Sequence, residues 1–149
     1  MEIRNTRGEV ICSYEGLLRE VNFDSANLSG AILENENLEG TCFDDANLES
    51  AILRCSDLYW ARFYRANLSG ANLEAADLRG AVLDEANLER ANLKNANLSL
   101  DNLGGHTDLQ SANLRNARVD GAKFSGALYN AKTIFPEGFD PKKEGMVAV

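Results

Sequence analysis

Apolar residues recur along the chain with a period of five. From residue 16 to residue 105, the third residue of every five-residue block is Leu or Phe, and the first is most often Ala. A step of five rotates an α-helix by about 500°, so the leucines would form no apolar stripe. We therefore expect the first and third residues to point inward from a short extended segment. The last two residues would turn the chain, and glycine is frequent at the fifth place, where a turn can require positive φ.

The spacing of the phenylalanines indicates how many blocks complete one coil. Phe23, Phe43 and Phe63 are twenty residues apart. Phe124 follows after three further twenties plus one residue, the residue by which the frame breaks near 104–106. A coil of four blocks would place all four phenylalanines in one column, whereas a coil of three would scatter them. The sequence therefore predicts an all-β, four-sided solenoid of about six coils, stacked about 4.8 Å apart.

One domain with three parts follows from where the period holds. Residues 1–15 resemble a hairpin that caps the first coil, with glycine in its turn. Residues 16–131 form the repeat, and residues 132–149 leave it as a C-terminal capping segment and tail. In this tail we expect Phe135 and Phe139 to fold back over the final coil, and the last residues to be mobile.

Composition and charge limit the classes of partner. The formal net charge of −8 argues against nonspecific binding to nucleic acid or to an anionic membrane, and it permits a basic partner. No apolar run is long enough to span a bilayer and no secretory signal is evident, so we expect a cytoplasmic protein. Cys12, Cys42 and Cys55 have neither metal-binding nor disulfide spacing, and we interpret them as free thiols in a reducing compartment.

The tandem pattern Ala-(Asn/Asp)-(Leu/Phe)-x-x, over roughly residues 16–131, resembles the pentapeptide repeat family. The resemblance implies a right-handed quadrilateral β-helix in which the central residue and the small residue two before it are both inside. The family has few known activities, and the resemblance also implies a protein that acts by contact with other proteins. Its best understood members protect DNA gyrase by mimicking the shape and charge of duplex DNA. Those members dimerise through an apolar C-terminal segment, for which this chain has no clear counterpart.

One cluster of side chains is a candidate contact site for a protein partner. A four-sided coil places its members at outward positions on two adjacent walls. They are Tyr59, Trp60, Arg62, Tyr64 and Arg65. Exposed aromatic residues beside Arg are typical of interaction hot spots. Alternatively, the rings lie flat on the coil and cover glycines on neighbouring rungs, such as Gly40 and Gly80.

Other polar clusters do not favour catalysis or metal binding. Asp101, His106 and Asp108 surround the frame break, but a single histidine without a partnered nucleophile fits a bulge or corner loop better. We therefore expect no enzyme activity, no cofactor and no metal site. Glu36 and Asp101 occupy the inward position normally held by Ala. We expect each to be partly exposed at a corner or bonded to N–H groups of a turn.

The sequence leaves two functional hypotheses open. The first is a rigid, acidic, non-enzymatic module that binds an unidentified protein partner, as a monomer or an end-to-end dimer. The second is a DNA mimic that inhibits or protects gyrase, with the negative charge supplied by the wall that carries the phenylalanines. The acidic residues of that wall are Asp24, Asp44, Asp45, Asp84 and Glu85. Because Tyr64 and Arg65 interrupt this stripe, a solvated face that keeps the coil soluble is the alternative interpretation.

Overall fold

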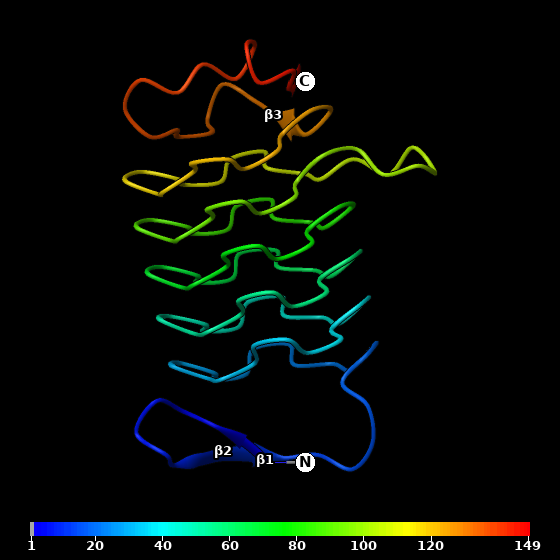
Figure 1. Ribbon diagram of the computed structural model, residues 1–149, viewed down its shortest axis with the longest axis vertical. Coiled ribbons are helices and arrows are strands. Elements are labelled where there is room, and N and C mark those ends of the chain that lie inside the picture. Colours follow the sequence, from blue (N-terminus) through cyan, green and yellow to red (C-terminus); the bar gives the residue numbers. More distant parts are fainter. Residues whose placement is uncertain (1) are drawn as a thin grey trace.

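The computed structural model describes residues 2–149 as a stack of flat coils, with the two ends of the chain at opposite ends of the stack (Figure 1). Strands β1 (Glu2–Arg4) and β2 (Val10–Ser13) form an antiparallel hairpin at the N-terminal end. Strands β3 (Leu128–Tyr129) and β4 (Val147–Ala148) pair in parallel at the other end. Within residues 2–149 no helix is long and apolar enough to cross a membrane.

Parallel bridges between residues twenty positions apart join each coil to the next. Asn27 bridges Asn47, Asn47 bridges Asn67, and the same register recurs on the other walls. The backbone of Asn47 makes two bonds to the preceding coil: its N–H donates to the carbonyl of Ala26 at 2.9 Å, and its carbonyl accepts from the N–H of Leu28 at 2.7 Å. This register confirms the predicted four-sided coil of twenty residues.

Most walls end in a tight turn, and the fifth residue of the block then takes a left-handed conformation. In one such turn the N–H of Ala31 donates to the carbonyl of Leu28 at 3.0 Å, and Gly30 between them has a φ of 66°. Glycine fits this place, yet Trp60 and Arg65 adopt the same conformation with φ values of 59° and 54°. The hydrogen-bonded coil thus imposes a backbone that costs a non-glycine residue roughly 1–2 kcal/mol in isolation.

The interior is a ladder of central Leu and Phe side chains, with Ala at the first position of most blocks. The rings of Phe23, Phe43 and Phe63 stack with centroids 5.6 Å and 5.0 Å apart, which confirms the predicted column. Each fully buried Leu or Phe contributes about 1.5–3 kcal/mol. A single coil cannot bury both of its faces, so stability depends on the stacking of neighbours.

One wall carries a ladder of hydrogen-bonded asparagine side chains. The amide of each residue donates to the amide oxygen of the residue one coil earlier, at 3.1 to 3.3 Å. The ladder consists of Asn27, Asn47, Asn67, Asn87 and Asn113. The same oxygens accept backbone N–H groups two residues later, as Asn67 accepts from Ser69 at 3.1 Å. Asparagine at the second place therefore both completes a turn and ties the coils together.

Six residues, rather than one, are inserted where the repeat frame breaks. Asp77 bridges Asn97, twenty positions on, but Val82 bridges Asp108, twenty-six positions on. The expectation of a single extra residue near 104–106 is wrong in extent, because six added residues shift a five-residue frame by the same amount as one. Leu103, at the central place of its block, is 78% exposed and lies outside the core. The segment projects from the stack as a loop, yellow-green in Figure 1.

Phe124 lies on a different wall from the other three core phenylalanines. Asn97 bridges Lys123, so Phe124 continues the column that contains Leu98 rather than that of Phe63. The predicted position of Phe124 is wrong for the same reason, the length of the inserted loop. Phe124 is buried and meets Phe139 edge-on, with ring centroids 5.1 Å apart.

The C-terminal segment continues the coil beyond residue 131. Ile134 bridges the coil beneath it. Phe135 and Phe139 stack on each other at 5.0 Å and pack against the core, as predicted. The expected mobility of the last residues is not what the structure shows, because β4 pairs with β3 and backbone hydrogen bonds hold the chain to its end.

The β1–β2 hairpin bonds to the first coil through its backbone. The N–H of Ile32 donates to the carbonyl of Arg4 at 2.8 Å, and the N–H of Thr6 donates to the carbonyl of Gly30 at 3.1 Å. Ile3 is fully buried against the end of the core. The hairpin thus satisfies backbone groups at an edge where no earlier coil exists.

Candidate interaction site

The five candidate contact residues lie on two consecutive turns of one coil and on the wall between them. Tyr59 and Trp60 end one wall, and Arg62, Tyr64 and Arg65 occupy the next. Trp60 is 50% exposed. The two arginines are exposed and the two tyrosines are half-buried. The aromatic residues therefore form two groups on one coil: Tyr59 contacts Trp60 at the first turn, and Tyr64 contacts Arg65 at the second. Each of the five residues also has a partner within the chain.

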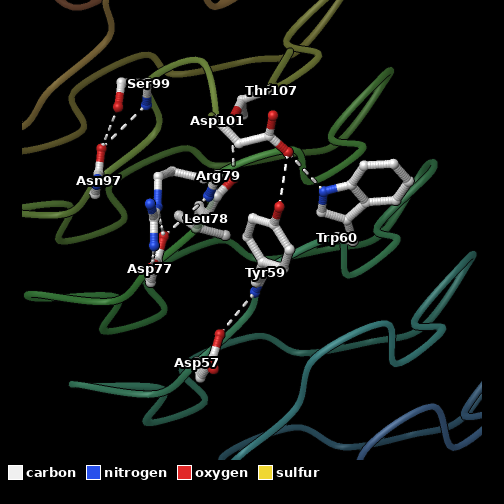
Figure 2. Close-up of polar contacts among 10 residues, drawn as sticks. All are labelled: Asp57, Tyr59, Trp60, Asp77, Leu78, Arg79, Asn97, Ser99, Asp101 and Thr107. Atoms are coloured by element: carbon white, nitrogen blue, oxygen red, sulfur yellow. Dashed lines mark hydrogen bonds and ion pairs between the residues drawn. The ribbon is translucent and has the colours of Figure 1, made fainter. Parts of the chain in front are cut away.

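Asp101 binds both aromatic residues of the first wall through one carboxylate oxygen. Its Oδ2 accepts a hydrogen bond of 2.9 Å from the Tyr59 hydroxyl and one of 2.8 Å from the Trp60 indole N–H (Figure 2). Its Oδ1 accepts from the backbone N–H groups of Leu103 at 2.8 Å and Gly105 at 2.6 Å. This confirms that the inward acid is bonded to turn N–H groups, and it joins the inserted loop to an earlier coil.

Four donors keep Asp101 ionised despite its burial. The residue is only 5% exposed, and desolvation of a buried carboxylate opposes ionisation. The hydrogen bonds from the Trp60 indole, the Gly105 N–H, the Tyr59 hydroxyl and the Leu103 N–H outweigh that effect and lower the pKa of Asp101 to about 2. The bond to Asp101 in turn raises the pKa of the Tyr59 hydroxyl. At neutral pH the network therefore holds a carboxylate and a protonated phenol.

The Trp60 ring covers a glycine on the next rung. A Cβ added to Gly80 would lie 2.7 Å from both Cδ1 and Nε1 of Trp60, which is closer than real Cβ contacts allow. The interpretation in which a ring lies over Gly80 is therefore correct. Gly40 faces the side chain of Glu20 instead. Trp60 thus has a structural role while half of its surface stays accessible.

Both arginines of the second wall pair with carboxylates one coil earlier. Arg65 donates from Nε and Nη2 to the two oxygens of Asp45, at 2.8 Å and 2.7 Å. Its guanidinium also lies over the Tyr64 ring, 4.9 Å from the centroid. Arg62 pairs with Asp44. The bonds from Arg65 lower the pKa of Asp45, and the two pairs neutralise part of the acidic wall.

The frame break does not gather a catalytic or metal-binding group. His106 Nδ1 lies 2.6 Å from the carbonyl oxygen of Gly126, whereas the carboxylate of Asp108 accepts from the backbone and side chain of Gln110. Asp101, His106 and Asp108 therefore have separate partners. Across residues 2–149 no group of three potential metal ligands occurs. The three cysteines are unpaired in the same part of the chain.

The inserted loop is the part of this site that sequence reasoning missed. Leu103 at its tip and Leu100 just before it are 78% and 42% exposed. Both lie within the five-residue frame, so the sequence alone does not distinguish them from residues of the regular coil. The sequence feature that could have indicated the loop was Asp101, an acidic residue at the first position of its block, which usually holds Ala. Glu36, the other acid at such a place, is half-buried, as predicted.

Comparison with known proteins places these features in a family. The family model for pentapeptide repeats matches residues 37–70, 61–99 and 105–128 in eight copies, together more than half of the chain. The gap between the second and third matches, residues 100–104, overlaps the inserted loop. No curated protein sequence matches the chain.

Several solved structures are similar to the coil. The pentapeptide repeat protein alr5209 from Nostoc PCC 7120 has a TM-score of 0.51 and 31% identity, covering 88% of this chain and 86% of that one. Rfr23, a pentapeptide repeat protein from the cyanobacterium Cyanothece 51142, has a TM-score of 0.51 and 26% identity, covering 78% and 88%. QnrB1, a plasmid-mediated fluoroquinolone resistance protein, has a TM-score of 0.51 and 19% identity, covering 86% and 79%, a likeness of fold alone. Proteins of this kind fold as right-handed quadrilateral β-helices.

Proposed function

The chain belongs to the pentapeptide repeat family, and from this premise we propose that it is a non-enzymatic module that binds a protein partner. One observation carries the proposal, a half-exposed tryptophan followed by two exposed arginines on the next wall of a regular coil. The contact residues are Tyr59, Trp60, Arg62, Tyr64 and Arg65. Aromatic and arginine side chains supply many interaction hot spots. Because hydrogen bonds and ring contacts already order these side chains, little conformational entropy is lost on binding.

We infer that the rod has about six coils with both ends closed. Without the six inserted residues, the repeat contains twenty-two blocks, or about five and a half coils. The C-terminal segment adds the rest. The hydrogen bonds of the β1–β2 hairpin and the packing of Phe135 and Phe139 support a capping role for the two end segments. We expect a monomer or an end-to-end dimer, which sedimentation velocity distinguishes.

Affinity capture from cells of the source organism tests the proposed function. The wild-type chain is expected to recover a protein partner, and Arg62→Ala and Tyr64→Ala are expected to reduce that recovery. Trp60→Ala removes the ring, whereas Trp60→Phe keeps a smaller aromatic surface and removes the N–H that binds Asp101. Equal recovery by all four variants and the wild type would count against these residues as the contact site.

A second candidate function is inhibition or protection of DNA gyrase by imitation of duplex DNA. In its favour is the net charge of −8, with Asp24, Asp84 and Glu85 on one wall. Against it, Arg62 and Arg65 form ion pairs in the middle of that wall. A supercoiling assay with purified gyrase decides between the two functions. No change in supercoiling at micromolar protein removes the DNA-mimic function.

A further inference from the structure

The inserted loop, residues 101–106, presents an apolar side chain to solvent on an ordered backbone. Leu103 is 78% exposed. Asp101 holds the N–H groups of Leu103 and Gly105 at 2.8 Å and 2.6 Å, and His106 contacts the carbonyl of Gly126 at the other end of the loop. Because Leu103 is mostly exposed, its side chain contributes little burial energy to the fold. The hydrogen bonds therefore hold a leucine in a position outside the hydrophobic core.

Two more exposed apolar side chains lie beside this loop. Trp60 is 50% exposed and bonds to Asp101. Leu100, directly before the loop, is 42% exposed and lies over Gly126. We call Trp60, Leu100 and Leu103 the apolar tip. Contiguous exposed apolar surface on a soluble protein commonly marks an interaction site.

Three carboxylates lie on the wall that follows the loop, one on the wall itself and two at the turn that ends it. They are Asp84, Glu85 and Asp108, and within residues 2–149 none of them forms an ion pair. Burial, together with repulsion from Asp108 and Glu85, raises the pKa of Asp84. Glu85 interacts electrostatically with Arg65, whereas Asp84 and Asp108 have no ion pair in the described part of the chain that compensates their negative charge.

The wall that precedes the loop has a polar groove of about 390 Å³. Its lining consists of Glu39, Asp57, Tyr59, Asp77, Arg79 and the loop residue Asn102. Arg79 pairs with Asp77, and Glu39 pairs with Arg19. Asp57 accepts the backbone N–H of Tyr59 and has no ion pair within the described residues (Figure 2). A carboxylate without a direct ion pair thus lies on this side of the loop as well, although the charge of Arg79 acts on it.

We propose that the loop recognises a protein surface that is apolar at its centre and basic at its rim. Leu103 and Trp60 contact the apolar centre, and lysine or arginine side chains of the partner pair with Asp84, Asp108 and Asp57. The ordered loop loses little entropy on binding, and the rim charges favour the correct orientation. A nucleic acid or an anionic membrane is repelled by the same carboxylates. The inference rests on the proposed function, but it centres the contact on the loop rather than on Arg62, Tyr64 and Arg65.

Selection of phage-displayed random peptides on the purified full-length chain tests this inference with a defined probe. Selected peptides are expected to combine Lys or Arg with Leu, Phe or Trp. A synthetic copy of the strongest peptide should bind Leu103→Asp and Asp108→Lys at least about tenfold more weakly than wild type. Leu17→Asp is the matched control, because Leu17 is 83% exposed but lies near the hairpin. Added salt should weaken binding to the wild type.

The outcomes separate this inference from the proposed function. Selected peptides without basic residues, or binding that Leu103→Asp leaves unchanged, overturn the inference. If Arg62→Ala and Tyr64→Ala abolish binding while Leu103→Asp does not, the inference fails and the contact site of the proposed function stands. If neither set of variants changes binding, both fail. Leu103 is exposed, so its variants should fold, which circular dichroism and the unfolding midpoint verify.

Discussion

The indole N–H of Trp60 donates a hydrogen bond of 2.8 Å to Oδ2 of Asp101, forty-one residues along the chain. One ring therefore covers Gly80 and also fixes the start of the inserted loop. The loop is anchored by side chains of an earlier coil as well as by its own backbone. Its order should consequently depend on wall residues that are distant in sequence.

Removal of the indole N–H should loosen the loop without changing the coil. In Trp60→Phe, Asp101 loses one of its four donors, so the loop opens more often. The amides of Leu103 and Gly105 are expected to exchange with deuterium about tenfold faster, the effect of one lost bond to a charged group. Hydrogen exchange read by mass spectrometry or NMR measures this. Tyr64→Phe, on the neighbouring wall, should leave both amides unchanged, and equal exchange in Trp60→Phe would contradict the anchoring role.

The low pKa of Asp101 predicts a loss of stability in acid. Its folded pKa is about 2, against an ordinary value of 3.8. A lowered folded pKa means that the carboxylate stabilises the fold fully above about pH 4 and that this contribution disappears as the pH falls toward 2. The thermal midpoint of the wild type should exceed that of Asp101→Asn at pH 7, and the gap should narrow between pH 4 and pH 2. A gap that stays constant to pH 2 would exclude the carboxylate as its source.

Two leucines at the central place of consecutive blocks should differ strongly in how much stability their truncation costs. Leu98 is fully buried, so Leu98→Ala should lower the free energy of unfolding by about 2–5 kcal/mol. Leu103 is exposed, so Leu103→Ala should change it by less than about 0.5 kcal/mol. Equilibrium unfolding in urea gives both values. A large loss in Leu103→Ala would mean that the block belongs to the core after all.

At the fifth place of a block, replacement of alanine by glycine should be tolerated, whereas replacement of glycine by alanine should lower stability. Gly80→Ala adds a Cβ at a φ of 70° and against Trp60, and should cost about 1–3 kcal/mol of stability. Ala75→Gly relieves a residue with a φ of 56° and should gain about 0.5 kcal/mol, since the relief exceeds the added freedom of the unfolded chain.

A double-mutant cycle separates the two causes at residue 80. In a Trp60→Ala background the ring contact is gone, so Gly80→Ala should cost only the backbone term. Thermal unfolding of the four proteins measures the coupling. An unchanged cost would show that the ring does not confine residue 80.

The regular part of the fold was predictable because its signal repeats. Every regular coil repeats the same pattern of inward and outward positions. The twenty-residue spacing of Phe23, Phe43 and Phe63 was therefore enough to predict four walls. The inserted loop was not predictable in the same way. A frame shift of one and a frame shift of six are indistinguishable in a five-residue pattern, and Leu103 stands where a core leucine would. The displaced column of Phe124 follows from the same ambiguity.

The two ends show a second limit of the pattern. Residues beyond 131 lack the five-residue period, yet Ile134 still bridges the coil and β4 pairs with β3. Backbone hydrogen bonds do not require the repeat sequence, so a segment without it can extend the coil. The Asp101 network was hidden for a related reason, because its partners are forty or more residues apart and no local pattern joins them.

The asparagine ladder passes the inserted loop without a break. Asn113 donates to Asn87 at 3.3 Å, just as Asn87 donates to Asn67 on the coil before. The loop leaves the rod at one corner while the ladder holds the spacing of another wall. For protein engineering, the junction between residues 100 and 107 is therefore a grafting point, where foreign peptides of other lengths can be displayed on a scaffold that keeps its register elsewhere.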